Sequence, residues 1–427
     1  MPLTLQQAFD PKANSIGFLR WLMAFAVIFA HAGPLGGFYG GHDLGTQISK
    51  EQSIGGVAVA GFFFFSGFLI TQSRRGKSTI FRYFWRRALR IFPAFWLALL
   101  TTAFVLAPIA WFREAGTMDG YWDAGNESPY TYFVNNMWLV LGQRNIAGMG
   151  HSLPFASIGG FDWNGSAWTL MYEFRAYIIV GVLGLVGALA HRWIGATIGV
   201  SFIVLNALTW TGAMNMLAIS PFLSNPFNVM FFAPFGFGML FALFGDRIPI
   251  DDRIAIAAII AALVAYRYGG WNAWGQYGFL YFLMWFAVRA KKLNRWEKYG
   301  DMSYGIYIFA WPLMQFGAYF GLQTKGWLVY HLVIIVATHI LAFASWHLIE
   351  KPAMSLKNWT PAPLAAVIAR GAPAVDAIKR RLVNPDFSSS NFAKRMRSET
   401  AAAEPRAAAP APGVEPAADR TTEEVRA

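Results

Sequence analysis

Long apolar segments alternate along this chain with short polar or basic ones. Ten of the apolar segments are long enough to cross the hydrocarbon core of a bilayer, about 30 Å thick, as helices. They are 15–35, 53–73, 91–112, 168–190, 194–214, 227–245, 254–269, 275–289, 303–321 and 327–349. The pattern predicts an all-α, polytopic integral membrane protein with about ten transmembrane helices.

The composition supports the membrane prediction and excludes several other classes. Of the 427 residues, 56% are hydrophobic and 14% charged, which is too apolar for a soluble chain with a polar surface. The net charge of +12 would suit a nucleic-acid partner, but Lys and Arg stand in short blocks between apolar segments, so we expect no nucleic-acid binding. Without cysteine, the chain has no disulfide, thiolate metal site or acyl-cysteine intermediate.

The basic blocks predict the orientation in the membrane. "RRGKSTIFRYFWRRALR" lies between the second and third apolar segments and "RAKKLNRWEK" between the eighth and ninth. Because basic loops stay in the cytoplasm, both termini are expected there, in a multi-pass protein of the plasma membrane surrounded by its lipids. The predicted parts are a cytoplasmic segment 1–14, a transmembrane domain 15–352 with an outer loop 113–167 that forms a lid or platform, and a largely disordered cytoplasmic tail 353–427.

Ionisable residues inside the apolar segments indicate an internal polar site. Arg20 and His31 are eleven residues apart, so on a helix they share one face at a separation of about 16 Å. A charge in a membrane span costs roughly 2.5–3.5 kcal/mol and usually faces the protein interior. Glu173 enters the membrane from the outer side and shares the depth of His31, which favours a carboxylate–imidazole pair suited to general-base chemistry. The alternative is a buried pair that only joins two helices.

A second group of candidates lies toward the inner side. Arg86, Arg87 and Arg90 begin the third segment, where Arg86 and Arg90 share a helix face, and arginine forks suit phosphates. The alternative is that they set topology and contact anionic lipid headgroups. In the phenylalanine-rich second segment, Ser66 and Gly67 form a small-residue position that a neighbouring helix or a slender ligand could approach closely.

The last apolar segment carries His331, His339 and His347 at intervals of eight residues. Each interval turns a helix by about 80° and rises about 12 Å, so the three imidazoles cannot converge on one ion. We therefore expect core or interface histidines and no metal cofactor. The signatures of serine hydrolases, P-loop nucleotidases and zinc peptidases are absent from the sequence.

The motifs "LRWLMAFAVIFAH", "FFFFSGFLI", "RRALRIFP", "NGSAWTLMYE", "GDMSYGIYIFAWP" and "LIEKP" occur in this order. Together they resemble the membrane-bound acyltransferase 3 family, over about residues 15 to 352. The resemblance implies a ten-helix enzyme that takes an acyl group, often acetyl, from cytoplasmic acyl-CoA. It also implies a carbohydrate hydroxyl as acceptor, on a surface glycan, a lipid-linked sugar or a glycosylated metabolite.

The resemblance also implies residue roles. His31 carries the catalytic role as general base, with Glu173 as its partner or on the acceptor side. The donor-binding candidates are Arg20, Ser66, Arg86, Arg87 and Arg90, and the acceptor-binding candidates are Asn164, Trp168 and Glu173. An acyl-histidine intermediate stays open.

The chain departs from this family at one motif. Where many relatives have a histidine after the "SYGIYL" pattern, this chain has Phe309, Ala310 and Trp311, so no chemistry is assigned there. The rival class is a transporter, in which Arg20, His31 and Glu173 bind substrate or relay protons. Against a transporter, the sequence shows no inverted repeat, and the inner arginines suit a phosphate-bearing donor.

Overall fold

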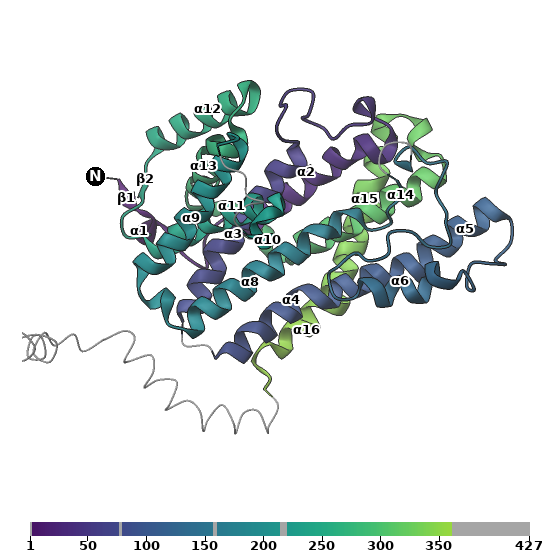
Figure 1. The fold of residues 1–427 in the computed structure, drawn as a ribbon, viewed down its shortest axis with the longest axis horizontal. Helices are drawn as coiled ribbons and strands as arrows, with labels where there is room; N and C mark the ends of the chain where they lie inside the picture. The colour runs from purple at the N-terminus through teal and green to yellow at the C-terminus, as the bar shows by residue number, and fades with distance from the viewer. Residues whose placement is uncertain (1, 77–78, 157–159, 214–219, 361–427) are drawn as a thin grey trace, which may run out of the picture. The chain divides into compact units, whose positions relative to one another are not determined.

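The computed structural model describes residues 2–76, 79–156, 160–213 and 220–360 (Figure 1). The chain divides into two units, Met1–Pro373 and Ala374–Ala427, and the described residues all belong to the first. They are mostly helical, with one pair of short strands, which confirms the all-α part of the predicted fold class. The main helices are α2 (Ile16–Gly36), α3 (Ile54–Arg75), α4 (Ile80–Thr101), α5 (Ala107–Ala115), α6 (Pro129–Asn136), α8 (Leu170–Leu185), α9 (Arg192–Trp210), α11 (Pro226–Leu243), α12 (Asp252–Tyr268), α13 (Gln276–Arg289), α14 (Ser303–Tyr319) and α15 (Trp327–Ser345).

Short elements complete the described part. They are the helices α1 (Leu5–Ala8), α10 (Pro221–Ser224) and α16 (Lys351–Ser355) and the strands β1 (Leu3–Thr4) and β2 (Pro249–Ile250). The strands pair antiparallel with Leu3 opposite Ile250, which joins the N-terminal segment to the connection between α11 and α12.

Seven helical stretches among the described residues are long and apolar enough to cross a membrane. They are Ile16–Gly36, Ile54–Arg75, Ile80–Ala115, Gly165–Leu185, Arg192–Trp210, Pro226–Leu243 and Trp327–Asn358. The other three predicted segments also form helices, but α12, α13 and α14 have only 17, 14 and 17 residues. The structure therefore supports a multi-pass membrane protein, and the count of ten spans stays a prediction.

Two helices extend beyond their predicted bounds. The third begins at Ile80, well before the predicted residue 91, and runs through a π-helical segment to Ala115. The arginine-rich sequence suggested a loop before residue 91, but it forms the first turns of the helix, from which Arg87 and Arg90 reach into the protein. The last helical stretch continues past residue 352 to Asn358, and the Trp85 indole donates a hydrogen bond to the carbonyl of Leu356 (2.9 Å). The rest of the predicted disordered tail, from residue 361, lies outside the described residues.

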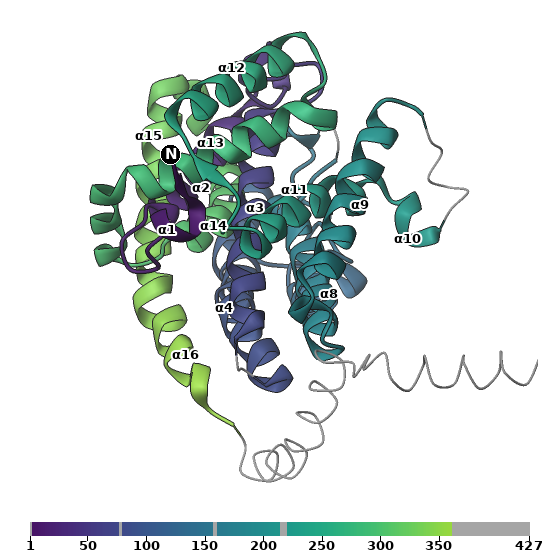
Figure 2. The same ribbon diagram turned by 90° about the vertical axis from the view of Figure 1, so that its left-hand side faces the viewer.

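Helix α3 lies in the middle of the bundle between α2 and α11 (Figure 2). It crosses α11 in backbone contact, because a Cβ at Gly67 would lie 2.0 Å from the carbonyl oxygen of Phe235, and one at Gly238 would lie 2.0 Å from that of Phe64. Only glycine allows this approach. The expected close approach of a neighbouring helix at Gly67 is confirmed.

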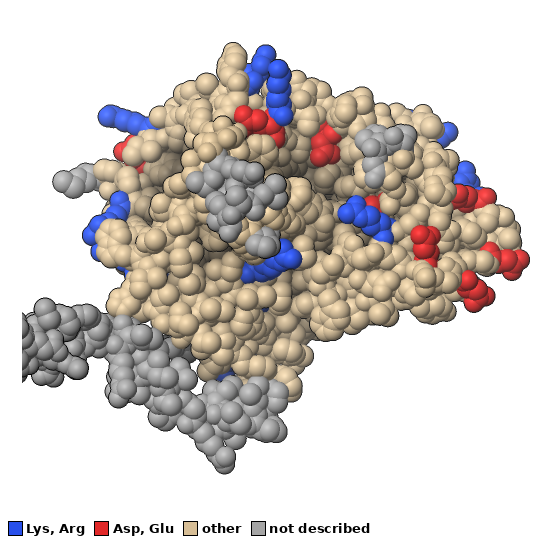
Figure 3. Space-filling view, in the orientation of Figure 1, with Lys and Arg blue, Asp and Glu red and all other residues tan. Residues whose placement is uncertain are grey.

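The predicted outer loop, 113–167, is anchored to neighbouring helices. The Tyr121 hydroxyl donates to the carbonyl of Ala103 (2.6 Å), and the Trp96 indole donates to that of Met137 (2.9 Å). Acidic side chains gather on the α5 side of the face drawn in Figure 3, whereas the rest of that face is mostly tan with a few separate Lys, Arg, Asp and Glu side chains. A surface with few charges is expected of a protein surrounded by lipid.

Candidate active site

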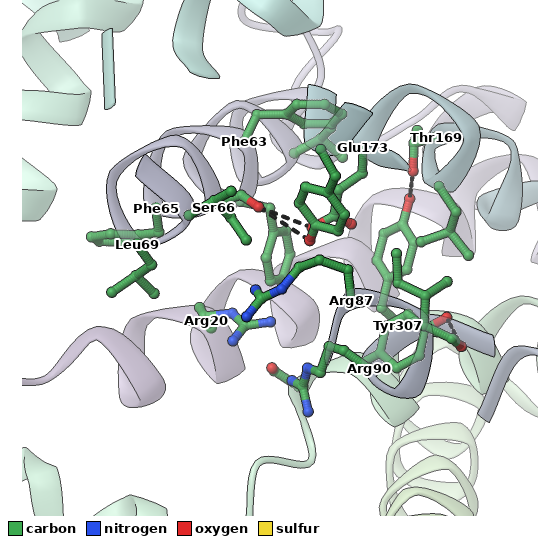
Figure 4. Close-up of a pocket in the computed structure, with 18 residues that line it drawn as sticks. Arg20, Phe63, Phe65, Ser66, Leu69, Arg87, Arg90, Thr169, Glu173 and Tyr307 are labelled. Atoms are coloured by element: carbon green, nitrogen blue, oxygen red, sulfur yellow. Dashed lines mark hydrogen bonds between the residues drawn. The ribbon is translucent and has the colours of Figure 1, made fainter. Parts of the chain in front are cut away.

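A cavity lies between α2, α3, α4, α8 and α14 (Figure 4). It holds about 800 Å³ of empty space, part of it open to solvent. Its charged and hydroxyl lining includes Arg20, Ser66, Arg87, Arg90 and Glu173, and its remaining wall is mostly aromatic and aliphatic. Five of the residues singled out in the sequence thus line one space, although they come from four different helices.

Two of the cavity arginines share one carboxylate. Asp301 accepts hydrogen bonds from Arg20 (3.2 Å) and from Arg90 (2.5 Å), and Arg90 also lies 3.8 Å from Glu350. Burial alone would raise the pKa of Asp301, but Arg90 and Arg20 hold it well below its usual range. Sequence reasoning missed Asp301, and its only signal was its place beside Ser303 in the motif "GDMSYG".

Arg87 differs from its two neighbours in the cavity. Among the described residues, no carboxylate forms an ion pair with it within 4.0 Å, and its buried Nε lacks a hydrogen-bond partner there. Its guanidinium lies over the Tyr177 ring, 5.9 Å from the centroid. Figure 4 shows the side chain extending from α4 into the cavity. Arg87 is therefore the arginine best placed to bind an anionic ligand.

Glu173 is held inside the cavity by two hydroxyl groups. Ser66 donates a hydrogen bond to its Oε1 (3.1 Å), and Tyr177 donates to the same oxygen. The expected Glu173–His31 pair is wrong, since these are the side-chain partners of Glu173 and His31 has a different carboxylate. The depth estimate failed because the helical stretch begins at Gly165, which places Glu173 eight residues, or about 12 Å, along it.

His31 pairs with Asp43, which follows α2 in the chain. Its Nδ1 lies 3.3 Å from Asp43 Oδ1, and both side chains are partly exposed. Gly33 allows this arrangement, because a Cβ there would lie 1.8 Å from the carbonyl oxygen of His42. The imidazole and the Trp311 ring meet at a steep angle of 69°, with centroids 4.9 Å apart. Asp43 was missed in the sequence, where its only signal was an acidic residue twelve positions after His31.

The His31–Asp43 pair lies just beyond one end of the cavity. A Cβ at Gly55 would lie 3.9 Å from His31 Cε1, and Val59, four residues further along α3, lines the cavity. On α14, Trp311 contacts His31 while Tyr307, four residues earlier, lines the cavity. One helical turn, or about 6 Å, therefore separates His31 from the cavity wall along both helices.

Besides His31, three sequence candidates lie outside the cavity. Arg86 points away from it and donates to Asn358 Oδ1 (2.9 Å), so the expectation that Arg86 and Arg90 act from one face is wrong. Asn164 is buried and donates to the Tyr132 hydroxyl (2.7 Å), which fixes the outer loop. Trp168 packs its ring against Phe227, with centroids 4.8 Å apart.

The histidines of the last helical stretch bond to their own helix. In His331, His339 and His347, Nδ1 pairs with the carbonyl four residues earlier at 2.7, 2.8 and 2.9 Å. Within the described ranges, no group of three or more His, Cys, Asp or Glu side chains could hold a metal ion.

Asp162 in the outer loop gives a pH prediction. Burial raises its pKa from 3.8 to about 6, although Arg144 and the backbone N–H of Asn164 oppose the shift. Between these values the folded state binds more protons than the unfolded state, so the stability contribution falls as pH rises through 6. In the unchanged protein this titration should lower the free energy of unfolding by roughly 1 kcal/mol between pH 5 and 7. Asp162→Asn cannot titrate and should not show this decrease, as measured by thermal unfolding in detergent. An Asn variant that is much less stable at pH 7 would mean that the pair with Arg144 outweighs the burial cost.

The fold and the cavity define a multi-pass helical membrane protein with an internal cavity whose lining includes three arginines. Residues 14–347 match the family model described as an acyltransferase domain. This match covers most of the chain, which therefore belongs to the acyltransferase 3 family and is an acyltransferase.

Individual relatives agree with the family. The chain is 26% identical over 357 residues to a protein of Shigella phage Sf6 named O-acetyl transferase, covering 80% of this chain and 96% of that one. It is 26% identical over 373 residues to Nodulation protein 10 of Rhizobium leguminosarum bv. viciae, covering 81% of this chain and 94% of that one. A segment of 99 residues is 29% identical to Acyltransferase MdmB of Streptomyces mycarofaciens, covering 23% of this chain and 25% of that one. No solved structure matches the chain.

Proposed function

We propose that this acyltransferase moves an acyl group from acyl-CoA to a carbohydrate hydroxyl, and that the acyl group is acetyl. The acceptor belongs to a surface glycan, a lipid-linked sugar or a glycosylated metabolite. The observation that carries the proposal is one cavity that has Arg87 in its lining and the His31–Asp43 pair one helical turn beyond it. The name of the phage relative, O-acetyl transferase, supports acetyl as the group transferred.

The cavity suits the two parts of an acyl-CoA molecule. Arg87 binds a phosphate of the donor, and Arg20 and Arg90, fixed by Asp301, add positive potential beside it. The apolar wall receives the uncharged arm that ends in the thioester. Glu173, held by Ser66, accepts a hydrogen bond from an amide N–H of this arm.

At His31 the chemistry is that of a general base. Asp43 accepts a hydrogen bond from the Nδ1–H group of His31, which leaves Nε2 unprotonated and able to remove the proton of the acceptor hydroxyl. The hydroxyl oxygen then attacks the thioester carbonyl carbon, the carbon–sulfur bond breaks, and the leaving thiolate takes the proton from the imidazolium. The products are the acyl ester and CoA. Direct transfer and an acyl-histidine intermediate both fit this placement.

The orientation of the site follows from the basic segments. Both termini and the mouth near Arg87 face the cytoplasm, where acyl-CoA is made, and the outer loop and His31 face the opposite side of the plasma membrane. The support for this orientation is the positive-inside distribution of Lys and Arg around α4 and after α13.

Arg87→Ala tests the donor site. A charged hydrogen bond to phosphate is worth about 1.5–3 kcal/mol, so acetyl-CoA binding should weaken roughly ten- to hundredfold in calorimetry on the purified protein. Arg86→Ala is the matched control, since its neighbouring guanidinium points away from the cavity. Equal affinities of the two variants for acetyl-CoA would contradict the proposed donor site.

A further inference from the structure

Arg175 is a charged residue inside a spanning helix that the proposed transfer does not use. It lies in the middle of the stretch Gly165–Leu185, two residues after Glu173, so its side chain leaves α8 on the far side from the cavity. A charge at such a position is costly and usually marks a binding or transport function.

The contacts of Arg175 leave its charge without a counter-ion. Its Nη1 donates to Asn228 Oδ1 (3.3 Å), and its guanidinium lies 5.4 Å from the centroid of the Tyr172 ring. In the described part of the chain, no Asp or Glu oxygen lies within 4.0 Å of it. Asn228 is the third residue of α11, so the guanidinium reaches from the middle of its own helical stretch to the first turn of α11.

A groove surrounds this guanidinium between α8, α10 and α11, which Figure 1 shows close together. It holds about 890 Å³ of largely open space and is lined by Arg175, Ile178, Ile179, Phe222, Asn225 and Asn228. Its rim is apolar and exposed, with Ile178 at 42% and Phe222 at 41% of their full exposure. One cation and two amides within an apolar rim match an anionic headgroup that carries a hydrocarbon chain.

We propose that this groove binds the phosphate of a lipid that carries the sugar acceptor, so that the acceptor is a lipid-linked glycan. The inference rests on the proposed transfer to a carbohydrate hydroxyl. It selects one of the three acceptor classes, because a free glycosylated metabolite has no hydrocarbon chain to occupy the rim.

Aromatic side chains connect the groove to the cavity and to His31. The Trp168 ring lies 5.4 Å from Phe231, which stacks on Phe63 of the cavity wall at 4.8 Å. Three residues before Trp168, Gly165 packs against Trp311, which contacts His31. Trp168 is itself half-buried, so a sugar attached to a phosphate at Arg175 can contact this ring on the side of the groove toward His31. An ordinary membrane phospholipid has no glycan to make this contact.

Binding of farnesyl diphosphate to the purified full chain tests the groove, since this probe joins an apolar chain to phosphates. Followed by tryptophan fluorescence, its affinity should fall roughly ten- to hundredfold in Arg175→Gln, which keeps a polar side chain but loses the charge. Arg267→Gln, at the exposed end of α12, should bind the probe like the unchanged protein. Both variants should bind acetyl-CoA normally, which shows that they are folded.

Three outcomes would overturn the proposal: unchanged probe binding by Arg175→Gln, displacement of the probe by an equal concentration of phosphatidylglycerol, or equally tight binding of inorganic diphosphate. The last two would indicate a general lipid-headgroup site or a free-phosphate site. If Arg175→Gln does not fold, Ile178→Trp fills the exposed rim and should block the probe, and unchanged binding would again contradict the proposal. Failure of the unchanged protein to bind acetyl-CoA would instead contradict the proposed function, whatever the groove binds.

Discussion

Replacing His31 with glutamine is expected to lower acyl transfer by roughly 10²–10⁴-fold, the usual contribution of a general base. Glutamine keeps a polar side chain of similar reach but has no nitrogen that can take the hydroxyl proton. Donor binding should be unchanged, because Arg20, which shares Asp301 with Arg90, lies eleven residues or about three helical turns before His31 on α2. Transfer is measured by mass spectrometry of the acylated product, and donor binding by calorimetry on the same preparation.

Asp43→Asn should reduce transfer less than His31→Gln, because an amide still accepts a hydrogen bond from Nδ1 but no longer stabilises the imidazolium. His331→Gln is the matched control, since His331 bonds to the carbonyl of Trp327 on its own helix and should leave transfer unchanged. Retained transfer by His31→Gln would rule out His31 as the base. Loss of donor binding in that variant would mean that His31 shapes the cavity instead.

Arg90→Ala is expected to destabilise the folded protein by about 3–5 kcal/mol, the usual cost of removing one partner from a buried ion pair. The change leaves Glu350, whose side chain is 2% exposed, without its cation, and leaves Asp301 with Arg20 alone. Thermal unfolding in detergent measures the effect. Arg86→Ala, on the exposed side of the same helix, should shift stability by less than about 1 kcal/mol.

The result for Arg90→Ala distinguishes a donor-binding role of Arg90 from a structural role, which the sequence alone could not do. If Arg90→Ala keeps normal stability and loses only donor affinity, Arg90 is a ligand of the donor and not a structural link between α4, α14 and the last helical stretch. In Arg87→Ala we expect donor affinity to fall and stability to stay near that of the unchanged protein. Within the described residues, Arg87 has no carboxylate partner that the change would leave unpaired.

Much of the fold was predictable because membrane spans depend on local composition. All ten predicted segments form helices, and Arg20 and Glu173 were correctly expected to face the interior, whereas only Arg87 and Arg90 of the three arginines near residue 90 line the cavity. The cost of exposing charge to lipid is a strong constraint, and it needs no knowledge of which helices are neighbours.

The pairing inside the site was not predictable, because it depends on contacts between distant segments. His31 could be given a carboxylate partner by depth alone, but the structure assigns Asp43 in place of Glu173 because the loop after α2 folds back at Gly33. Asp301 links α2 and α4 from a position far along the chain. Helical periodicity gave Arg86 the same face as Arg90, whereas Arg87, three residues before Arg90, is the one that joins it in the cavity.

Photolabelling with an acyl-CoA that carries a diazirine on its acyl chain tests the central claim most directly. In sealed inside-out membrane vesicles, the probe should label the cavity end near His31, on α3 around Gly55–Val59 and on α14 around Tyr307–Trp311, and excess acetyl-CoA should prevent the labelling. Sealed right-side-out vesicles should not be labelled, because CoA does not cross the membrane. Labelling only from the outside, or labelling confined to other helices, would contradict the proposed path from Arg87 to His31.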